Sequence, residues 1–76
     1  MNRFLVIIES GQNNYSAYVP DLPGCIATGK TLGEVKKNMR EAISLHLQGM
    51  IEDNEPIPSS SSLAEYIDVP TPHSAA

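Results

Sequence analysis

Apolar residues change their spacing along the chain, and these changes mark the predicted elements. Residues 3–9, RFLVIIE, are mostly β-branched or aromatic and end at the turn-forming residues SGQNN, after which YSAYV follows at residues 15–19. Two such runs around a turn predict a β-hairpin. After a proline-rich loop, CIATG at residues 25–29 predicts a short third strand that Gly29 ends.

A long helix is predicted after this third strand. Thr31 and Glu34 have the T-x-x-E spacing of a capping box, in which each side chain satisfies a free backbone N–H at the start of a helix. From Leu32 to about Asp53 there is no proline, and Pro56 then prevents continuation. Apolar residues recur through this stretch at helical spacing, at Leu32, Val35, Met39, Ala42, Ile43, Leu47, Met50 and Ile51.

The end of the chain predicts one more extended element. Four serines at residues 59–62 form a connector, LAEYIDV at residues 63–69 predicts a fourth strand, and PTPHSAA at residues 70–76 predicts a flexible C-terminal tail. The order is therefore β-β-β-α-β. It predicts a small two-layer α+β domain over residues 1–69, with an antiparallel sheet packed on one long helix.

The first strand is apolar on both sides, which has a consequence for assembly. Phe4, Val6 and Ile8 point one way, while Leu5 and Ile7 point the other. One helix covers only one face of a sheet. We therefore expect the second face or an adjacent edge to be an interface, either in a homodimer or higher homo-oligomer or with a different protein.

Composition and charge narrow the function classes. The 76 residues allow one domain, and the net charge of −4 argues against direct nucleic-acid binding and suits a basic protein partner. A single cysteine, Cys25, forms no internal disulfide and suggests no zinc site, so a reducing cytoplasmic setting is expected. The apolar run at residues 4–8 is too short for a signal peptide or a membrane span.

Few residues are candidates for chemistry. Cys25 with His46 or His73 is the possible nucleophile and base, but His73 lies in the predicted tail and His46 within the apolar stripe of the helix. Cys25 is better explained as a small buried hydrophobe. We therefore expect no enzyme activity, no catalytic residue, no metal and no cofactor.

Two other functions stay open from the residues. Asp21, in a constrained loop, could act with Glu9 in a ribonuclease-H-like hydrolase or its remnant, which would be metal-dependent. A small nucleic-acid-binding module would instead use the basic side chains of Lys30, Lys36, Lys37 and Arg40.

The run from residue 15 to residue 62 resembles a known family. It contains Y-x-A-x-V-P-D-L-P-G-C ahead of the third strand, then T-L-x-E-V, and a helix that closes in E-D-x-E-P-I-P. This loop, capped helix and terminator, in one order over about two thirds of the chain, are similar to the HicB-like antitoxins of bacterial toxin–antitoxin modules.

The resemblance implies a partial ribonuclease-H-like fold without nuclease activity. It also implies a partner, HicA, a small basic ribonuclease toxin that cleaves mRNA and whose active site the antitoxin masks, and it implies dimers or larger assemblies. The function expected is thus that of an antitoxin, a ribonuclease inhibitor acting through protein–protein interaction. The residues expected at the partner surface are Tyr15, Tyr18, Asp21, Leu22 and Pro23.

The sequence departs from the family's pattern at one end. Many HicB antitoxins carry a C-terminal helix-turn-helix or ribbon-helix-helix domain that binds their own promoter, and this chain ends in VPTPHSAA. We therefore expect no DNA-binding domain. A minimal antitoxin and an orphan HicB-like protein without a toxin gene both remain possible from the sequence.

Overall fold

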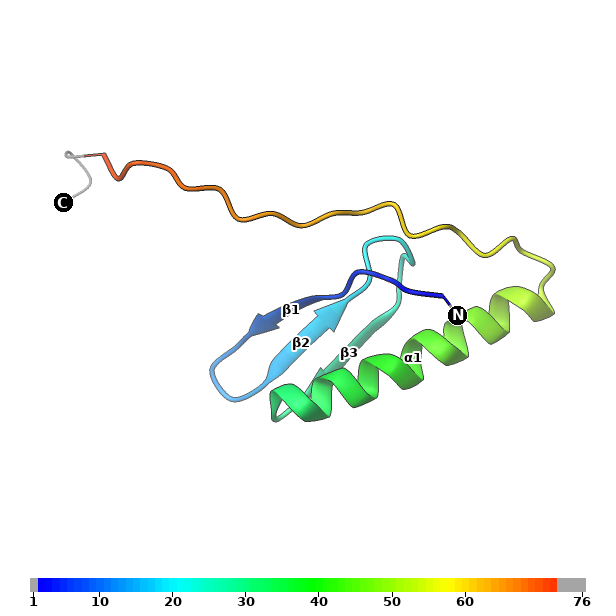
Figure 1. The fold of residues 1–76 in the computed structure, drawn as a ribbon. Coiled ribbons are helices and arrows are strands. Elements are labelled where there is room, and N and C mark those ends of the chain that lie inside the picture. The colour runs from blue at the N-terminus through cyan, green and yellow to red at the C-terminus, as the bar shows by residue number, and fades with distance from the viewer. Residues whose placement is uncertain (1, 73–76) are drawn as a thin grey trace.

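The computed structural model describes residues 2–72, which form three strands followed by one helix (Figure 1). β1 (Ile7–Ser10), β2 (Tyr15–Tyr18) and β3 (Ile26–Gly29) form an antiparallel sheet in the order β1-β2-β3. α1 (Leu32–Glu52) lies across one face of this sheet. The predicted α+β class, an antiparallel sheet packed on one long helix, is confirmed.

β1 is shorter than the predicted strand over residues 3–9 because its partner ends early. The last pair toward the N-terminus joins Ile7 to Tyr18. Beyond Tyr18 the backbone N–H of Val19 already donates to the carbonyl oxygen of Cys25, at 3.2 Å, and Pro20 has no N–H to donate. Residues 3–6 therefore continue β1 without ladder hydrogen bonds.

Two consecutive turns form the proline-rich loop between β2 and β3. The N–H of Leu22 donates to the carbonyl oxygen of Val19 at 3.1 Å, and the N–H of Cys25 donates to that of Leu22 at 3.0 Å. Pro23 and Gly24 are the central residues of the second turn, and Gly24 has φ +84°, the combination that a type II turn requires. Cys25, expected to begin the third strand, closes this turn instead.

Thr31 caps α1 as predicted. Its hydroxyl oxygen accepts a hydrogen bond from the N–H of Glu34 at 3.0 Å. The return bond differs from a standard capping box by one residue, because the Glu34 carboxylate accepts from the N–H of Lys30, at 3.3 Å, and not from that of Thr31. Both bonds fix the direction in which the chain enters the helix.

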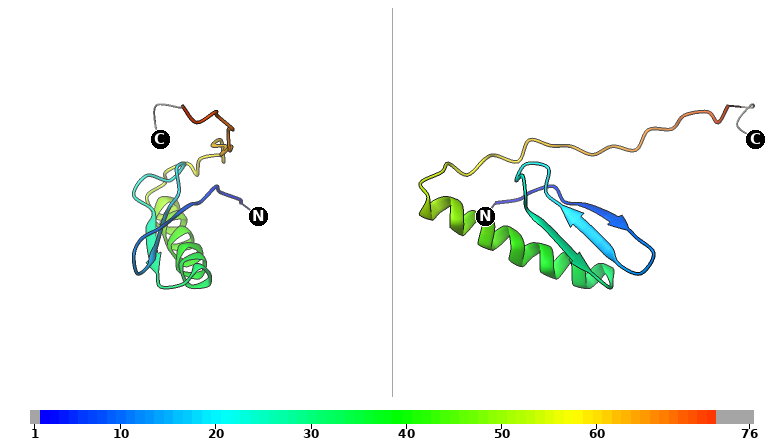
Figure 2. Two further views of the ribbon diagram at one scale, coloured as in Figure 1. Left: turned by 90° about the vertical axis from the view of Figure 1, so that its left-hand side faces the viewer. Right: turned by 180° about the vertical axis from the view of Figure 1, so that it is seen from behind.

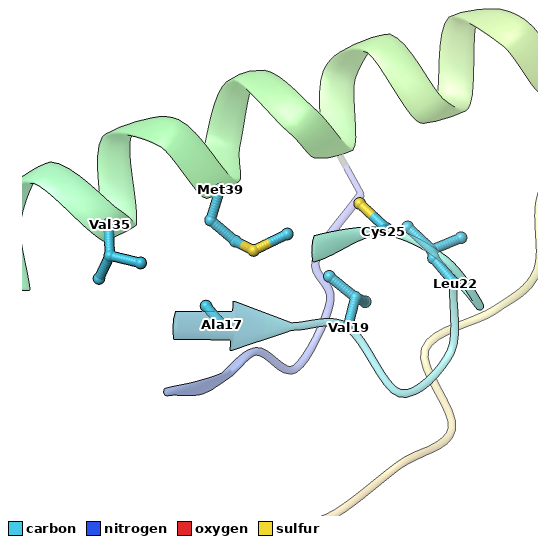
Figure 3. Close-up of a cluster of buried hydrophobic side chains, with 6 residues drawn as sticks. All are labelled: Ala17, Val19, Leu22, Cys25, Val35 and Met39. Carbon is cyan, nitrogen blue, oxygen red and sulfur yellow. The ribbon is translucent and has the colours of Figure 1, made fainter. Parts of the chain in front are cut away.

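The core lies between α1 and the inner face of the sheet. Figure 3 shows Val35 and Met39 pointing from the helix toward residues of β2 and the proline loop. The buried residues are Ala17, Val19, Leu22, Cys25, Val35 and Met39. The predicted helical stripe is confirmed in its middle, whereas its two ends, Leu32 and Ile51, are exposed.

The fourth strand predicted at residues 63–69 is not formed. These residues are extended, but no backbone hydrogen bond joins residues 63–72 to the rest of the described chain. Residues 64–66 and residues 5–8 line a common hollow of about 320 Å³, but no backbone hydrogen bond pairs the segment with β1. It runs past β1 and away from the helix (Figure 2). Residues 73–76 of the predicted tail, which include His73, lie outside the described residues.

Candidate partner-binding surface

The outer face of the sheet carries a row of apolar side chains. The register places Ile7 opposite Tyr18 and Tyr18 opposite Ile26, one residue from each strand. Alternation puts all three on the face opposite buried Ala17. Tyr18 is 42% exposed and Ile26 is 69% exposed, while Ile7 is half-buried. We call Ile7, Tyr18 and Ile26 the outer row.

The structure separates the five residues expected at the partner surface. Tyr18 and Pro23 are exposed, and Tyr15 is half-buried on the inner face, packed against the core. Leu22 is only 1% exposed, because the two turns of the proline loop direct it into the core. Its side chain is therefore not available to a partner in this structure.

Asp21 accepts hydrogen bonds from the connector that follows the helix. Its carboxylate accepts hydrogen bonds from the hydroxyls of Ser61 and Ser62, at 3.1 and 2.8 Å, and from their backbone N–H groups, at 3.1 and 3.3 Å. The hydrogen bond from the Ser62 hydroxyl is the largest cause that lowers the pKa of Asp21, because these bonds favour the ionised form. Asp21 thus fixes the path of residues 61–62 beside the proline loop.

The structure does not bring together Glu9 and Asp21, the two carboxylates of the hydrolase alternative. Glu9 lies opposite Ser16 in the register, toward the hairpin end of the sheet, whereas Asp21 follows the other end of β2. Within residues 2–72 there is also no group of three or more His, Cys, Asp or Glu side chains placed to hold a metal ion.

Cys25 and His46 are likewise not arranged as a nucleophile and base. Cys25 is buried in the core, and burial raises the pKa of its thiol. His46 is half-buried on α1, and no hydrogen bond joins the two side chains. The interpretation of Cys25 as a buried hydrophobe is confirmed.

Three of the five basic residues line one hollow. Arg3, Lys36 and Arg40 line a groove of about 500 Å³ between the N-terminal segment and α1, whose floor includes Phe4, Val6 and Ile43. Lys30 and Lys37 do not line it. We call this hollow the cationic groove. It lies on the helix side of β1, and the outer row lies on the opposite face.

The sequence reasoning missed Ile26. Its strand is only four residues long, and the alternation of Ile26, Ala27, Thr28 and Gly29 is too brief to indicate a face by itself. The signal was available indirectly, because pairing with β2 places Ile26 beside Tyr18. The sequence predicted that Ile7 points away from Phe4, Val6 and Ile8. In the structure these three residues pack against the core, and Ile7 lies on the outer face.

Among the described residues, no helix has both the length and the apolarity that crossing a bilayer requires.

Comparison with known proteins identifies similar chains. Residues 4–75 match the model of a family described as the HicB-like antitoxin of bacterial toxin–antitoxin systems. A 14.9 kDa protein from the rep-hol intergenic region of Haemophilus phage HP1 is 45% identical over 65 residues, 86% of this chain. The chain spans about half the length of that relative, 49%. A UPF0150 protein of Thermoplasma acidophilum is 38% identical over 68 residues, which cover 88% of this chain and 96% of that protein.

One solved structure is similar in both fold and sequence. It is a chain from the HicA3 and HicB3 toxin–antitoxin complex, with a TM-score of 0.66 and 27% sequence identity. The similarity covers 78% of this chain and 69% of the solved chain.

Proposed function

The chain belongs to the HicB-like antitoxin family of bacterial toxin–antitoxin systems, and we propose that it neutralises a HicA-type ribonuclease by covering the toxin's active site. In this proposal the domain is a partial ribonuclease-H-like fold that binds protein in the cytoplasm and catalyses no reaction. Self-association through surfaces that the toxin does not use is a second part of it.

The observation that carries the proposal is the outer row. Tyr18 and Ile26 expose apolar surface side by side on the sheet face opposite α1. Aromatic and apolar side chains at the centre of a flat, rigid surface are typical of the residues that supply most binding energy at protein interfaces. Pro23 adds an exposed corner in the proline-rich loop that follows β2.

The charge of this face supports a basic partner. Alternation places Glu9 on the same face as the outer row, two residues from Ile7 along β1. None of the residues of β1, β2 and β3 is basic. A small basic toxin, as the family resemblance implies, would approach this face without electrostatic repulsion.

The direct test mixes the purified chain with a HicA-type toxin and an RNA substrate. We expect cleavage to be abolished at an equimolar ratio. Undiminished cleavage with confirmed folding of both proteins would refute the proposal.

A matched pair of variants locates the surface. Ile26 is 69% exposed on the outer face and Leu45 is 70% exposed on α1, so both can be changed to lysine with similar effects on burial. We expect Ile26→Lys to weaken toxin binding at least about tenfold, because it removes an apolar contact and adds repulsion toward a basic partner. Leu45→Lys is expected to bind like the unmodified chain. Equal binding by both variants would exclude the outer row.

A further inference from the structure

Basic and acidic residues are distributed unevenly along this chain. The proposed toxin-binding face does not explain this distribution. All five basic residues lie within the first 40 residues, together with three of the nine acidic ones. Residues 41–76 contain the other six acidic residues and no lysine or arginine. A basic surface near the N-terminal half thus complements an acidic C-terminal segment.

The positively charged surface in this pair is the cationic groove. Three of the five basic side chains, Arg3, Lys36 and Arg40, line it, and its floor is apolar. Its volume of about 500 Å³ is sufficient for several side chains. A basic toxin is a poor occupant for a groove with this rim, because like charges oppose each other there.

The negatively charged segment in this pair is residues 63–69, which we call the arm. Leu63, Tyr66, Ile67 and Val69 are all exposed large hydrophobic residues, and Glu65 and Asp68 lie between them. An extended chain places Leu63, Glu65, Ile67 and Val69 on one side. The arm therefore offers an apolar face with a carboxylate at its centre, which matches an apolar floor with a cationic rim.

The arm does not occupy the groove of its own chain. Ser61 and Ser62 hold the start of the arm at Asp21, and residues 64–66 lie beside a different hollow with residues 5–8. No residue of the arm lines the cationic groove. Figures 1 and 2 show the chain leaving the domain past β1, away from α1.

We propose that the cationic groove of one copy receives the arm of a second copy, and that two copies exchange arms in a symmetric dimer. Each arm would bury its apolar side chains on the floor of the partner's groove and place Glu65 among the groove's basic residues. A reciprocal exchange closes on itself, as a two-fold symmetric assembly must. The inference rests on the self-association part of the proposed function and names its surface. It does not rest on toxin binding, because it concerns this chain alone and a different surface.

Site-directed cross-linking tests the contact on the full-length chain. One variant carries Ile43→Cys on the groove floor and another carries Ile67→Cys on the arm; the natural Cys25 is buried in both. After mixing and mild oxidation we expect a disulfide-linked heterodimer whose peptide mass joins positions 43 and 67. Leu45→Cys, exposed on the same helix but absent from the groove, replaces Ile43→Cys as the control and is expected to give at least tenfold less product.

Two results of this experiment would overturn the proposal. Heterodimer formation that is equal with Ile43→Cys and Leu45→Cys would indicate random collision. A chain that carries both Ile43→Cys and Ile67→Cys and closes an internal disulfide while remaining a monomer would identify the chain's own arm as the occupant.

Charge reversal provides a second test that needs no new cysteine. We expect Lys36→Glu to raise the dimer dissociation constant in sedimentation equilibrium at least tenfold, and Glu65→Lys in the same chain to restore it. Lys37→Glu, which does not line the groove, is the control. A monomeric unmodified chain at micromolar concentration, or failure of Glu65→Lys to restore a folded dimer, would contradict the exchange.

Discussion

The hydroxyl of Ser62 donates a hydrogen bond of 2.8 Å to the carboxylate of Asp21, which lies 41 residues earlier in the chain. With the bonds from Ser61, this contact ties the connector after α1 to the proline loop before β3. The start of the arm is thereby fixed in space, although no backbone hydrogen bond joins the arm to the rest of residues 2–72.

Asp21→Ala is expected to release the connector without unfolding the domain. All four hydrogen bonds at the carboxylate are lost, whereas the core residues around Leu22 are unchanged. Amide hydrogen exchange should therefore increase at Ser61 and Ser62 and stay slow in the middle of α1. Ser59→Ala and Ser60→Ala, in the same connector, are the controls. Unchanged exchange at Ser61 and Ser62 would contradict the anchoring role.

The hydrogen bonds between Asp21 and the two serines should break only at acidic pH. The folded pKa of Asp21 lies below its ordinary value of 3.8, because the serine donors favour the carboxylate. Its contribution to stability is therefore fully present above pH 3.8 and is lost as the pH falls through the lowered value. NMR shifts of the Ser61 and Ser62 amides should be constant from pH 7 to about pH 4 and move below that. A transition centred well above pH 4 would contradict this assignment.

Gly29→Ala is expected to destabilise the junction between β3 and α1. A Cβ at this position would lie 2.5 Å from the backbone nitrogen of Val35, so the strand or the first helical turn must shift. We expect a loss of about 1–3 kcal/mol in the free energy of unfolding, measured by urea titration. In Gly49→Ala the new methyl meets open space inside α1, and a gain of up to about 1 kcal/mol is expected. Similar effects of both changes would disprove the close-contact argument.

Cys25 is expected to react slowly with thiol reagents in the folded protein. The thiolate is the reactive form, and burial both raises the pKa of this thiol and blocks access to it. Labelling with a maleimide at pH 8 should be at least about tenfold slower in buffer than in denaturant. Fast labelling of the folded chain would revive Cys25 as a candidate nucleophile.

Local patterns predicted the elements of this fold well where one segment determines its own structure. The Thr31 cap and the Val35 and Met39 stripe follow from residue types at fixed spacing, and the structure has both. The prediction of a fourth strand was wrong because a strand needs a partner backbone. The sequence of residues 63–69 favours an extended chain but does not specify an edge to pair with.

The site was predicted less well for a related reason. Leu22 and Pro23 are neighbours in a loop rich in turn formers, and composition alone does not reveal which side chain points inward. The two turns decide it by directing Leu22 into the core and Pro23 to the surface. Ile26 became visible only through its pairing with Tyr18.

Leu22→Ala separates a structural role of the proline loop from a binding role. Leu22 is among the largest fully buried side chains, so its truncation leaves a cavity against the helix and is expected to cost about 2–5 kcal/mol. A domain of this size has net stability of about 3–5 kcal/mol, so the variant should be largely unfolded at 37 °C by circular dichroism. Leu45→Ala, the same truncation at a side chain that is 70% exposed, should change stability by less than about 0.5 kcal/mol. A stable Leu22→Ala variant that loses only toxin binding would return Leu22 to the partner surface.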